Sequence, residues 1–110
     1  MEIDGAMKRG SAEVAILSVL SRESLHGYEI ARRIEETSGG ALKFDLASLY
    51  PLLYRMERDA WLKAEWSEVG GRRRRCYTLT DKGRKQLGPM RAQWREFFAA
   101  LNRVAGIDHA

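Results

Sequence analysis

The sequence has few of the residues that enzymes and secreted proteins depend on. Its single cysteine, Cys76, excludes an internal disulfide and is typical of a protein kept in a reducing cytoplasm. The only histidines are His26 and His109, and no histidine and cysteine set has the spacing of a metal site. No nucleophile has an evident neighbouring base, and no glycine-rich phosphate loop occurs. We therefore expect no enzyme activity, no metal and no cofactor.

Long apolar runs and proline-rich linkers are also missing. No run approaches the roughly 18 residues that a membrane span requires, and the first residues lack the apolar core of a signal peptide. There is no repeat and no low-complexity tract. At 110 residues, the chain is expected to be one packed unit that stays in the cytoplasm and does not enter a membrane.

What the sequence has in excess is positive charge, carried mostly by arginine. The formal net charge is +4, and 14 of the 19 basic residues are arginines. A guanidinium makes forked, bidentate contacts with phosphate or guanine, so this bias makes nucleic acid the first partner to consider. A basic net charge can also serve only solubility, so the positions of the arginines must decide between nucleic-acid binding and solubility.

Four consecutive arginines, Arg72–Arg75, lie in a predicted β-hairpin. Residues 61–69 and 72–80 alternate in polarity, and Gly70 and Gly71 between them suit the positive φ angles of a hairpin turn. We expect these side chains to face inward: Leu62, Ala64, Trp66, Tyr77 and Leu79. Because a hairpin tip adds nothing to a core, we interpret the arginines as contacts to a phosphate backbone or a narrow minor groove. The alternative is a soluble turn that protects an edge strand, for which lysine would serve equally well.

Two helices are predicted near the N-terminus. Ser11 is a candidate N-cap for a helix over 11–22, which is apolar on nearly every side and so needs cover beyond its own domain. A second helix lies within 24–40 and ends at the glycine pair 39–40. Its expected buried stripe consists of Tyr28, Ala31 and Ile34.

A third helix, over 45–62, divides into two faces at about 100° per residue. The core face holds Leu46, Leu49, Leu53, Met56 and Ala60. The opposite face holds Ala47, Ser48, Pro51, Tyr54, Arg55 and Arg58. Proline is tolerated only near a first turn, so the helix is predicted to begin close to Asp45 or Ser48. The outer face is either a solvated surface or, given the arginine hairpin that follows, a surface that contacts nucleic acid.

Three stretches, "LHGYEIARRIEETSGG", "SLYPLLYRMERD" and "RRRRCYTLTDKGR", together resemble the hallmark segments of PadR-like transcriptional regulators. The resemblance runs from about Ser11 to the C-terminus and is closest to the compact subfamily. It implies a mostly α fold with a small β-hairpin: a winged helix-turn-helix over residues 1–80 and a C-terminal dimerisation helix over 81–110, packed as one unit. Two positions depart from the family pattern, since Ala60 replaces a usual glycine and Cys76 a common tyrosine.

The resemblance also implies a function. Such a protein is a sequence-specific regulator of transcription, in most cases a repressor released by a small molecule, that binds a pseudo-palindromic operator as a homodimer. In the family the third helix enters the major groove, which implies that Ser48, Tyr50 and Arg55 lie near it, with Arg74 and Arg75 in the wing. The alternative is a winged-helix module that binds RNA or a protein partner through the same arginines.

Independently, the C-terminal segment has the spacing of a helix that pairs with its twin. Apolar side chains repeat at intervals of three and four: Leu87, Met90, Trp94, Phe97, Leu101 and Val104. We expect Phe98 to join this seam, and Leu17 and Leu20 of the partner's first helix to pack on it. Gly88 and Pro89 predict a kink. A helix that folds back on its own domain is the alternative.

Two residues suggest finer roles. Trp94 falls where some regulators of this family hold planar aromatic ligands, although an aromatic side chain at a seam position usually belongs to a core. Neighbouring arginines would favour the thiolate of Cys76, which makes it a candidate redox switch, with a structural filler as the more ordinary role.

Overall fold

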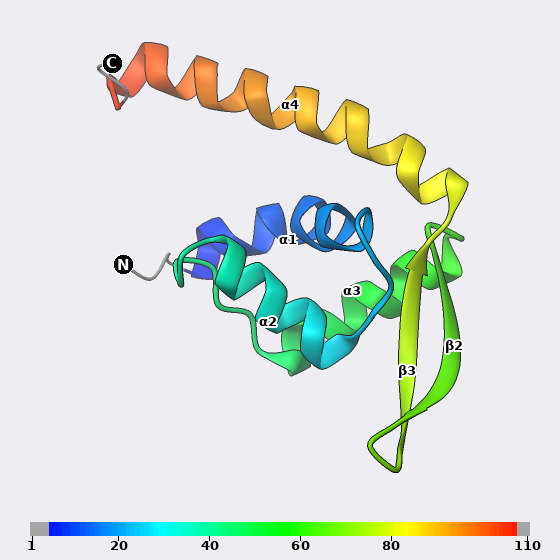
Figure 1. The fold of residues 1–110 in the computed structure, drawn as a ribbon. Coiled ribbons are helices and arrows are strands. Elements are labelled where there is room, and N and C mark those ends of the chain that lie inside the picture. Colours follow the sequence, from blue (N-terminus) through cyan, green and yellow to red (C-terminus); the bar gives the residue numbers. More distant parts are fainter. Residues whose placement is uncertain (1–4, 108–110) are drawn as a thin grey trace.

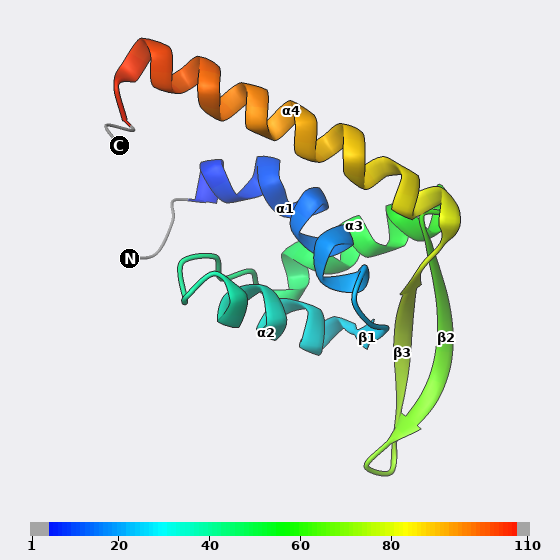
Figure 2. The ribbon, with the colours of Figure 1, turned by 45° about the horizontal axis from the view of Figure 1, so that its top comes forward.

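The structure is a computed structural model that describes residues 5–107. Along the chain the elements are α1 (Gly5–Leu20), β1 (Leu25–His26), α2 (Gly27–Thr37), α3 (Leu46–Arg58), β2 (Leu62–Val69), β3 (Arg72–Leu79) and α4 (Asp81–Ala105). The strands form an antiparallel sheet in the order β1-β3-β2. The β2–β3 hairpin, the wing, projects away from a cluster formed by α1, α2 and α3, while α4 runs alongside α1 (Figures 1 and 2). This is the predicted winged helix-turn-helix with a long C-terminal helix.

The core lies where α1, α2 and α3 meet the base of the sheet. Its largest fully buried side chains are Tyr77, Ile16, Leu17, Ile30, Leu49, Leu53, Met56 and Leu62. Within the described part of the chain no polar or charged residue is buried, so apolar burial holds the core, at about 1.5–3 kcal/mol for each large side chain. As its composition predicts, α1 is covered on more than one side.

The start of α1 differs from the prediction. Ser11 lies inside the helix, which begins at Gly5. Residues 6–9 (Ala, Met, Lys and Arg) favour helix and extend it in front of this serine in spite of Gly10. Leu17 and Leu20 are 0% and 3% exposed within their own chain. Neither side chain is therefore available to a partner's seam, and the prediction that they lie in a dimer interface is wrong.

In α2 the buried stripe is displaced from the predicted one. Ile30 and Ile34 are buried, whereas Tyr28 is 54% exposed. The inward position at the start of the helix belongs to Gly27, because a Cβ there would lie 2.7 Å from the Tyr50 hydroxyl. The two-residue strand β1, which the sequence did not predict, precedes this helix and pairs His26 with Cys76.

Helix α3 follows the predicted division into two faces along most of its length. Asp45 caps it by accepting a 2.8 Å hydrogen bond from the Ser48 amide, as expected for a helix that begins there. Leu49, Leu53 and Met56 are buried. Ala60, predicted on the core face, is exposed and adopts a φ of 63° because the helix ends at Arg58. This left-handed conformation favours glycine, which accounts for the residue usual in the family.

The wing forms around Gly70 and Gly71, whose φ angles of 60° and 78° confirm the predicted turn. Tyr77 and Leu79 are buried as expected. Trp66 lies on the same strand face as the buried Leu62 but is 57% exposed, not inward as predicted. The wing projects away from the helices that form the core (Figure 1).

Helix α4 is anchored at its start and continuous to its end. The Thr80 hydroxyl accepts a hydrogen bond from the Gly83 amide and donates to the carbonyl of Ala60. The helix runs unbroken through Gly88 and Pro89; the kink predicted there stays a prediction. Glycine before proline relieves the clash that disfavours a helical residue at that position.

The predicted seam of α4 falls into two parts. Leu87 is buried and Met90 packs on the core of the same chain, as the alternative interpretation predicts. Beyond Trp94 the helix leaves the core, and its large apolar side chains stay in solvent: Phe97, Phe98, Leu101 and Val104. Ile107, just after the helix, is exposed as well.

Candidate nucleic-acid interface

Residues from α2, α3 and the wing line one hollow of about 240 Å³. We call this the wing hollow; its lining consists of His26, Gly27, Tyr28, Tyr50, Tyr54, Trp66, Arg73, Arg74 and Arg75. The structure thus brings the predicted tyrosines of α3 together with three of the predicted arginines. Guanidinium and phenol groups are donors that bind phosphate oxygens and base edges.

The α3 side of this surface presents residues to solvent at different depths. Ser48 and Arg58 are exposed. Tyr50 is half-buried against Gly27 and stacks on Tyr54, with ring centroids 5.9 Å apart. Tyr54 is 53% exposed, so Tyr50 supports the ring that solvent reaches.

Arg55 does not project freely from α3. Its guanidinium forms an ion pair with the carboxylate of Glu13 in α1, and both side chains are only about a third exposed. Helical periodicity placed Arg55 on the outer face but gave no signal for Glu13, because the pairing depends on how two distant helices pack.

The four wing arginines divide between the two faces of β3, since neighbouring side chains on a strand point to opposite sides. Arg73 and Arg75 lie over the ring of Trp66, with Cζ at 5.0 Å and 5.7 Å from its centroid. Arg75 also forms an ion pair with Glu57 of α3, and this hydrogen bond raises the pKa of Arg75. Neither Trp66 nor Glu57 was predicted as a site residue: the alternation of β2 placed Trp66 on the same side as Leu62 and Ala64 and gave no sign of its contact with the arginines.

Next to the arginines, β3 carries a thiol and a phenol that are buried or half-buried. Burial raises the pKa of Cys76, and Glu29 and Glu65 raise it further. The thiolate is thus disfavoured, contrary to the effect expected from the arginines, and the redox role loses its basis. Burial, followed by the proximity of Tyr54, raises the pKa of Tyr77 to about 12, so its hydroxyl stays neutral.

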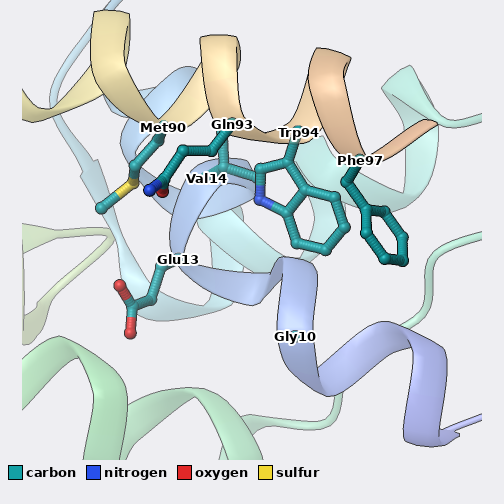
Figure 3. A pocket seen from close by; sticks show the side chains of 7 residues that line it. All are labelled: Gly10, Glu13, Val14, Met90, Gln93, Trp94 and Phe97. Atoms are coloured by element: carbon teal, nitrogen blue, oxygen red, sulfur yellow. The ribbon is translucent and has the colours of Figure 1, made fainter. Parts of the chain in front are cut away.

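A second hollow, of about 400 Å³, lies between α1 and α4 (Figure 3). The Trp94 ring extends from α4 toward α1, where a Cβ on Gly10 would lie 3.7 Å from its edge. Phe97 meets Trp94 edge to face, with centroids 5.5 Å apart. The remaining lining residues are Glu13, Val14, Met90 and Gln93. Trp94 therefore packs partly within its own chain and partly lines a cavity.

Other kinds of site find no support in residues 5–107. No group of three or more histidine, cysteine or acidic side chains there has the arrangement of a metal site. No helix in this range is both long and apolar enough to cross a membrane. His109 lies outside the described residues.

Three packed helices, a paired wing and a basic hollow between them define a winged helix-turn-helix protein. The Transcriptional regulator PadR-like family matches residues 16–89, which is more than half of the sequence, and the chain belongs to this family. The family is one of transcriptional regulators rather than of enzymes.

Individual relatives agree with this assignment. A transcriptional regulator of Mycobacterium tuberculosis is 34% identical over 80 residues, which cover 73% of this chain and 72% of the relative. The structure of a transcriptional regulator from Clostridium thermocellum superposes with a TM-score of 0.85 at 25% identity, covering 94% of this chain and 98% of that one. Bacillus subtilis PadR in complex with operator DNA gives a TM-score of 0.65 at 26% identity, with 71% of this chain and 45% of that chain covered.

Proposed function

We propose that this protein is a cytoplasmic repressor that binds a pseudo-palindromic DNA operator as a homodimer. The wing hollow carries the proposal, because it joins Tyr54 of α3 to Arg73 and Arg74 of the wing on one surface. In this arrangement α3 enters the major groove with Ser48, Tyr54 and Arg58, while the wing contacts the flanking backbone or minor groove. The similarity to a PadR protein solved with operator DNA supports it.

The homodimer is supported by the exposed apolar stripe on α4. Phe97 and Phe98 are 52% and 61% exposed, and Leu101 and Val104 continue the same face. A second copy of α4 would cover this stripe and remove it from water. In such a dimer residues 81–110 join the subunits, and residues 1–80 of each contact one half-site. The two α3 helices would then lie about one helical turn, roughly 34 Å, apart.

Removing the wing arginines that form no ion pair within residues 5–107 tests DNA binding. We expect the triple variant Arg72→Ala, Arg73→Ala and Arg74→Ala to bind every duplex more weakly and with a smaller salt dependence, because each lost phosphate contact lowers the slope of log K against log salt by about 1. Arg75 is kept so that Glu57 retains its partner. Fluorescence anisotropy on a labelled duplex, repeated over a salt series, measures the slope.

A matched control removes the same charge elsewhere. The exposed arginines Arg84, Arg91 and Arg95 of α4 can be replaced together by alanine, which changes the net charge equally. The control is expected to keep the wild-type slope. An equal loss in both triple variants would show that net charge, not the wing, binds DNA.

The proposed release of the repressor uses the hollow between α1 and α4. A planar aromatic effector would stack on Trp94 and weaken DNA binding by favouring a different angle between the subunits. A compound that bound both arrangements equally would leave DNA affinity unchanged. The test is fluorescence quenching by planar dyes and phenolics in a variant whose only tryptophan is Trp94, made by Trp61→Phe and Trp66→Phe. Quenching that survives Trp94→Leu in the otherwise unchanged protein would exclude this site.

A further inference from the structure

Four side chains form a continuous stack from α3 toward the tip of the wing. The Glu57 carboxylate accepts a hydrogen bond from Arg75, whose guanidinium lies 5.7 Å from the centroid of the Trp66 ring. The guanidinium of Arg73 lies 5.0 Å from the same centroid. We call these four residues the wing stack.

The strand register explains how the wing stack forms. Trp66 is directly opposite Arg75 in the β2–β3 ladder, and Arg73 is its diagonal neighbour on the same face. Side chains in both relations are within reach when one of them is a large aromatic ring. Trp66 belongs to no part of the core, since it is 57% exposed and lines the wing hollow. Its ring packs against the guanidiniums of both arginines.

The two arginines of the stack present different groups to solvent. Arg75 uses part of its donor edge on Glu57, and its side chain is only 31% exposed. Arg73 is exposed, and within residues 5–107 no ion pair joins it to a carboxylate, including that of its cross-strand neighbour Glu68. Stacking occupies the face of a guanidinium and leaves the N–H groups at its edge free for a bidentate phosphate contact.

We propose that Trp66 is a positioning residue that holds Arg73 ready to bind a DNA phosphate, and that Arg75 fixes Trp66 to α3 instead of contacting DNA. Holding the guanidinium in advance reduces the rotamer entropy that a long side chain loses on binding. The inference rests on the proposed DNA binding. Within the arginine run it gives Arg73 the role of binding phosphate and Arg75 the role of supporting Trp66.

A double-mutant cycle on Trp66 and Arg73 tests the proposal. The probe is a fluorescein-labelled DNA duplex of about 30 base pairs, long enough for two half-sites one helical turn apart. We expect Trp66→Ala to weaken binding by about fivefold, the effect of one exposed cation–π contact, and Trp66→Phe to recover most of this loss. In the Arg73→Ala background, Trp66→Ala should cause no further loss.

Arg72 supplies the matched control, because it belongs to the same run but lies on the other face of β3. In the double variant, the fold-losses in DNA affinity from Trp66→Ala and Arg72→Ala should multiply, as expected of residues that act independently. The proposal is wrong if Trp66→Ala weakens binding equally with and without Arg73, since Trp66 would then contact DNA itself or act through the fold. It is also wrong if Trp66→Ala leaves binding unchanged.

Two further measurements test the alternatives. Thermal unfolding shows whether Trp66→Ala acts by destabilising the fold, and the salt slope shows whether Arg75 contacts DNA directly. Thermal unfolding of Trp66→Ala should match that of the wild type, because this exposed ring contributes little to the core. Arg75→Ala should mimic Trp66→Ala without lowering the salt slope, whereas Arg73→Ala should lower it by about 1. A wild-type protein that binds no duplex would refute the proposed function; normal binding with independent effects of Trp66 and Arg73 would refute only this inference.

Discussion

Glu13 of α1 and Arg55 of α3 form an ion pair, although 42 residues separate them in the sequence. Glu13 also lines the hollow between α1 and α4, in which Trp94 lies. One residue therefore both lines the proposed effector cavity and pairs with the helix proposed to enter the major groove. As long as this pair persists, part of the positive charge of α3 is neutralised within the protein.

Replacing Glu13 by glutamine should release Arg55 for a phosphate. We expect DNA affinity to rise by up to about fivefold, because an exposed ion pair contributes at most about 1 kcal/mol. The free energy of unfolding should fall by no more than the same amount. Glu96→Gln, which breaks the exposed pair with Arg103 in α4, removes the same charge and is the control. An equal rise in affinity in both variants would mean that the lost negative charge, and not the released Arg55, strengthens DNA binding.

A charge placed in the exposed stripe of α4 should separate the proposed dimer. Phe97→Glu and Leu101→Glu would each bury a carboxylate between the subunits, which costs several kcal/mol without a partner. Light scattering should then give the mass of one chain, and binding to a two-half-site duplex should weaken. Ala99→Glu, on the opposite side of the helix, should remain dimeric. An intact dimer in both seam variants would place the interface elsewhere.

Gly83 is required by the close approach of α4 to the segment that joins α3 to β2. A Cβ at this position would lie 2.2 Å from the carbonyl oxygen of Trp61. We expect Gly83→Ala to lower the free energy of unfolding by about 2–3 kcal/mol, a typical cost of overpacking. Gly88→Ala, five residues further along the same helix, meets no atom within 4 Å and should change it by less than about 1 kcal/mol. Urea denaturation of both variants measures the difference.

Ala60 occupies a backbone conformation that suits glycine. Its φ of 63° costs a residue with a Cβ about 1–2 kcal/mol in the folded protein. Glycine avoids this cost but loses more conformational entropy on folding, which offsets part of the gain. Ala60→Gly should therefore stabilise the protein by about 0.5–1 kcal/mol. Ala92→Gly, in the exposed middle of α4, should destabilise it by about 1 kcal/mol. A midpoint of thermal unfolding that falls in both variants would contradict this account of Ala60.

Much of the fold was determined by local sequence. The capping of α3 by Asp45, the turn at Gly70 and Gly71 and the alternation that buries Tyr77 each depend on a few neighbouring residues. Backbone dihedral preferences and the two periods of side-chain direction act over that range, so a single sequence is sufficient to predict them. The same patterns placed Tyr54 and the arginines on outward surfaces.

The partners of those surface residues were decided only by the tertiary structure. Glu13 beside Arg55, Glu57 beside Arg75 and Gly83 beneath the Trp61 carbonyl all join different elements. The sequence also predicted Leu17 and Leu20 as interface residues, because an apolar helix has the same pattern whether its own chain or another covers it. Such pairings follow from the relative placement of whole helices and strands, which depends on how all the core side chains pack at once and leaves no signal in any short segment.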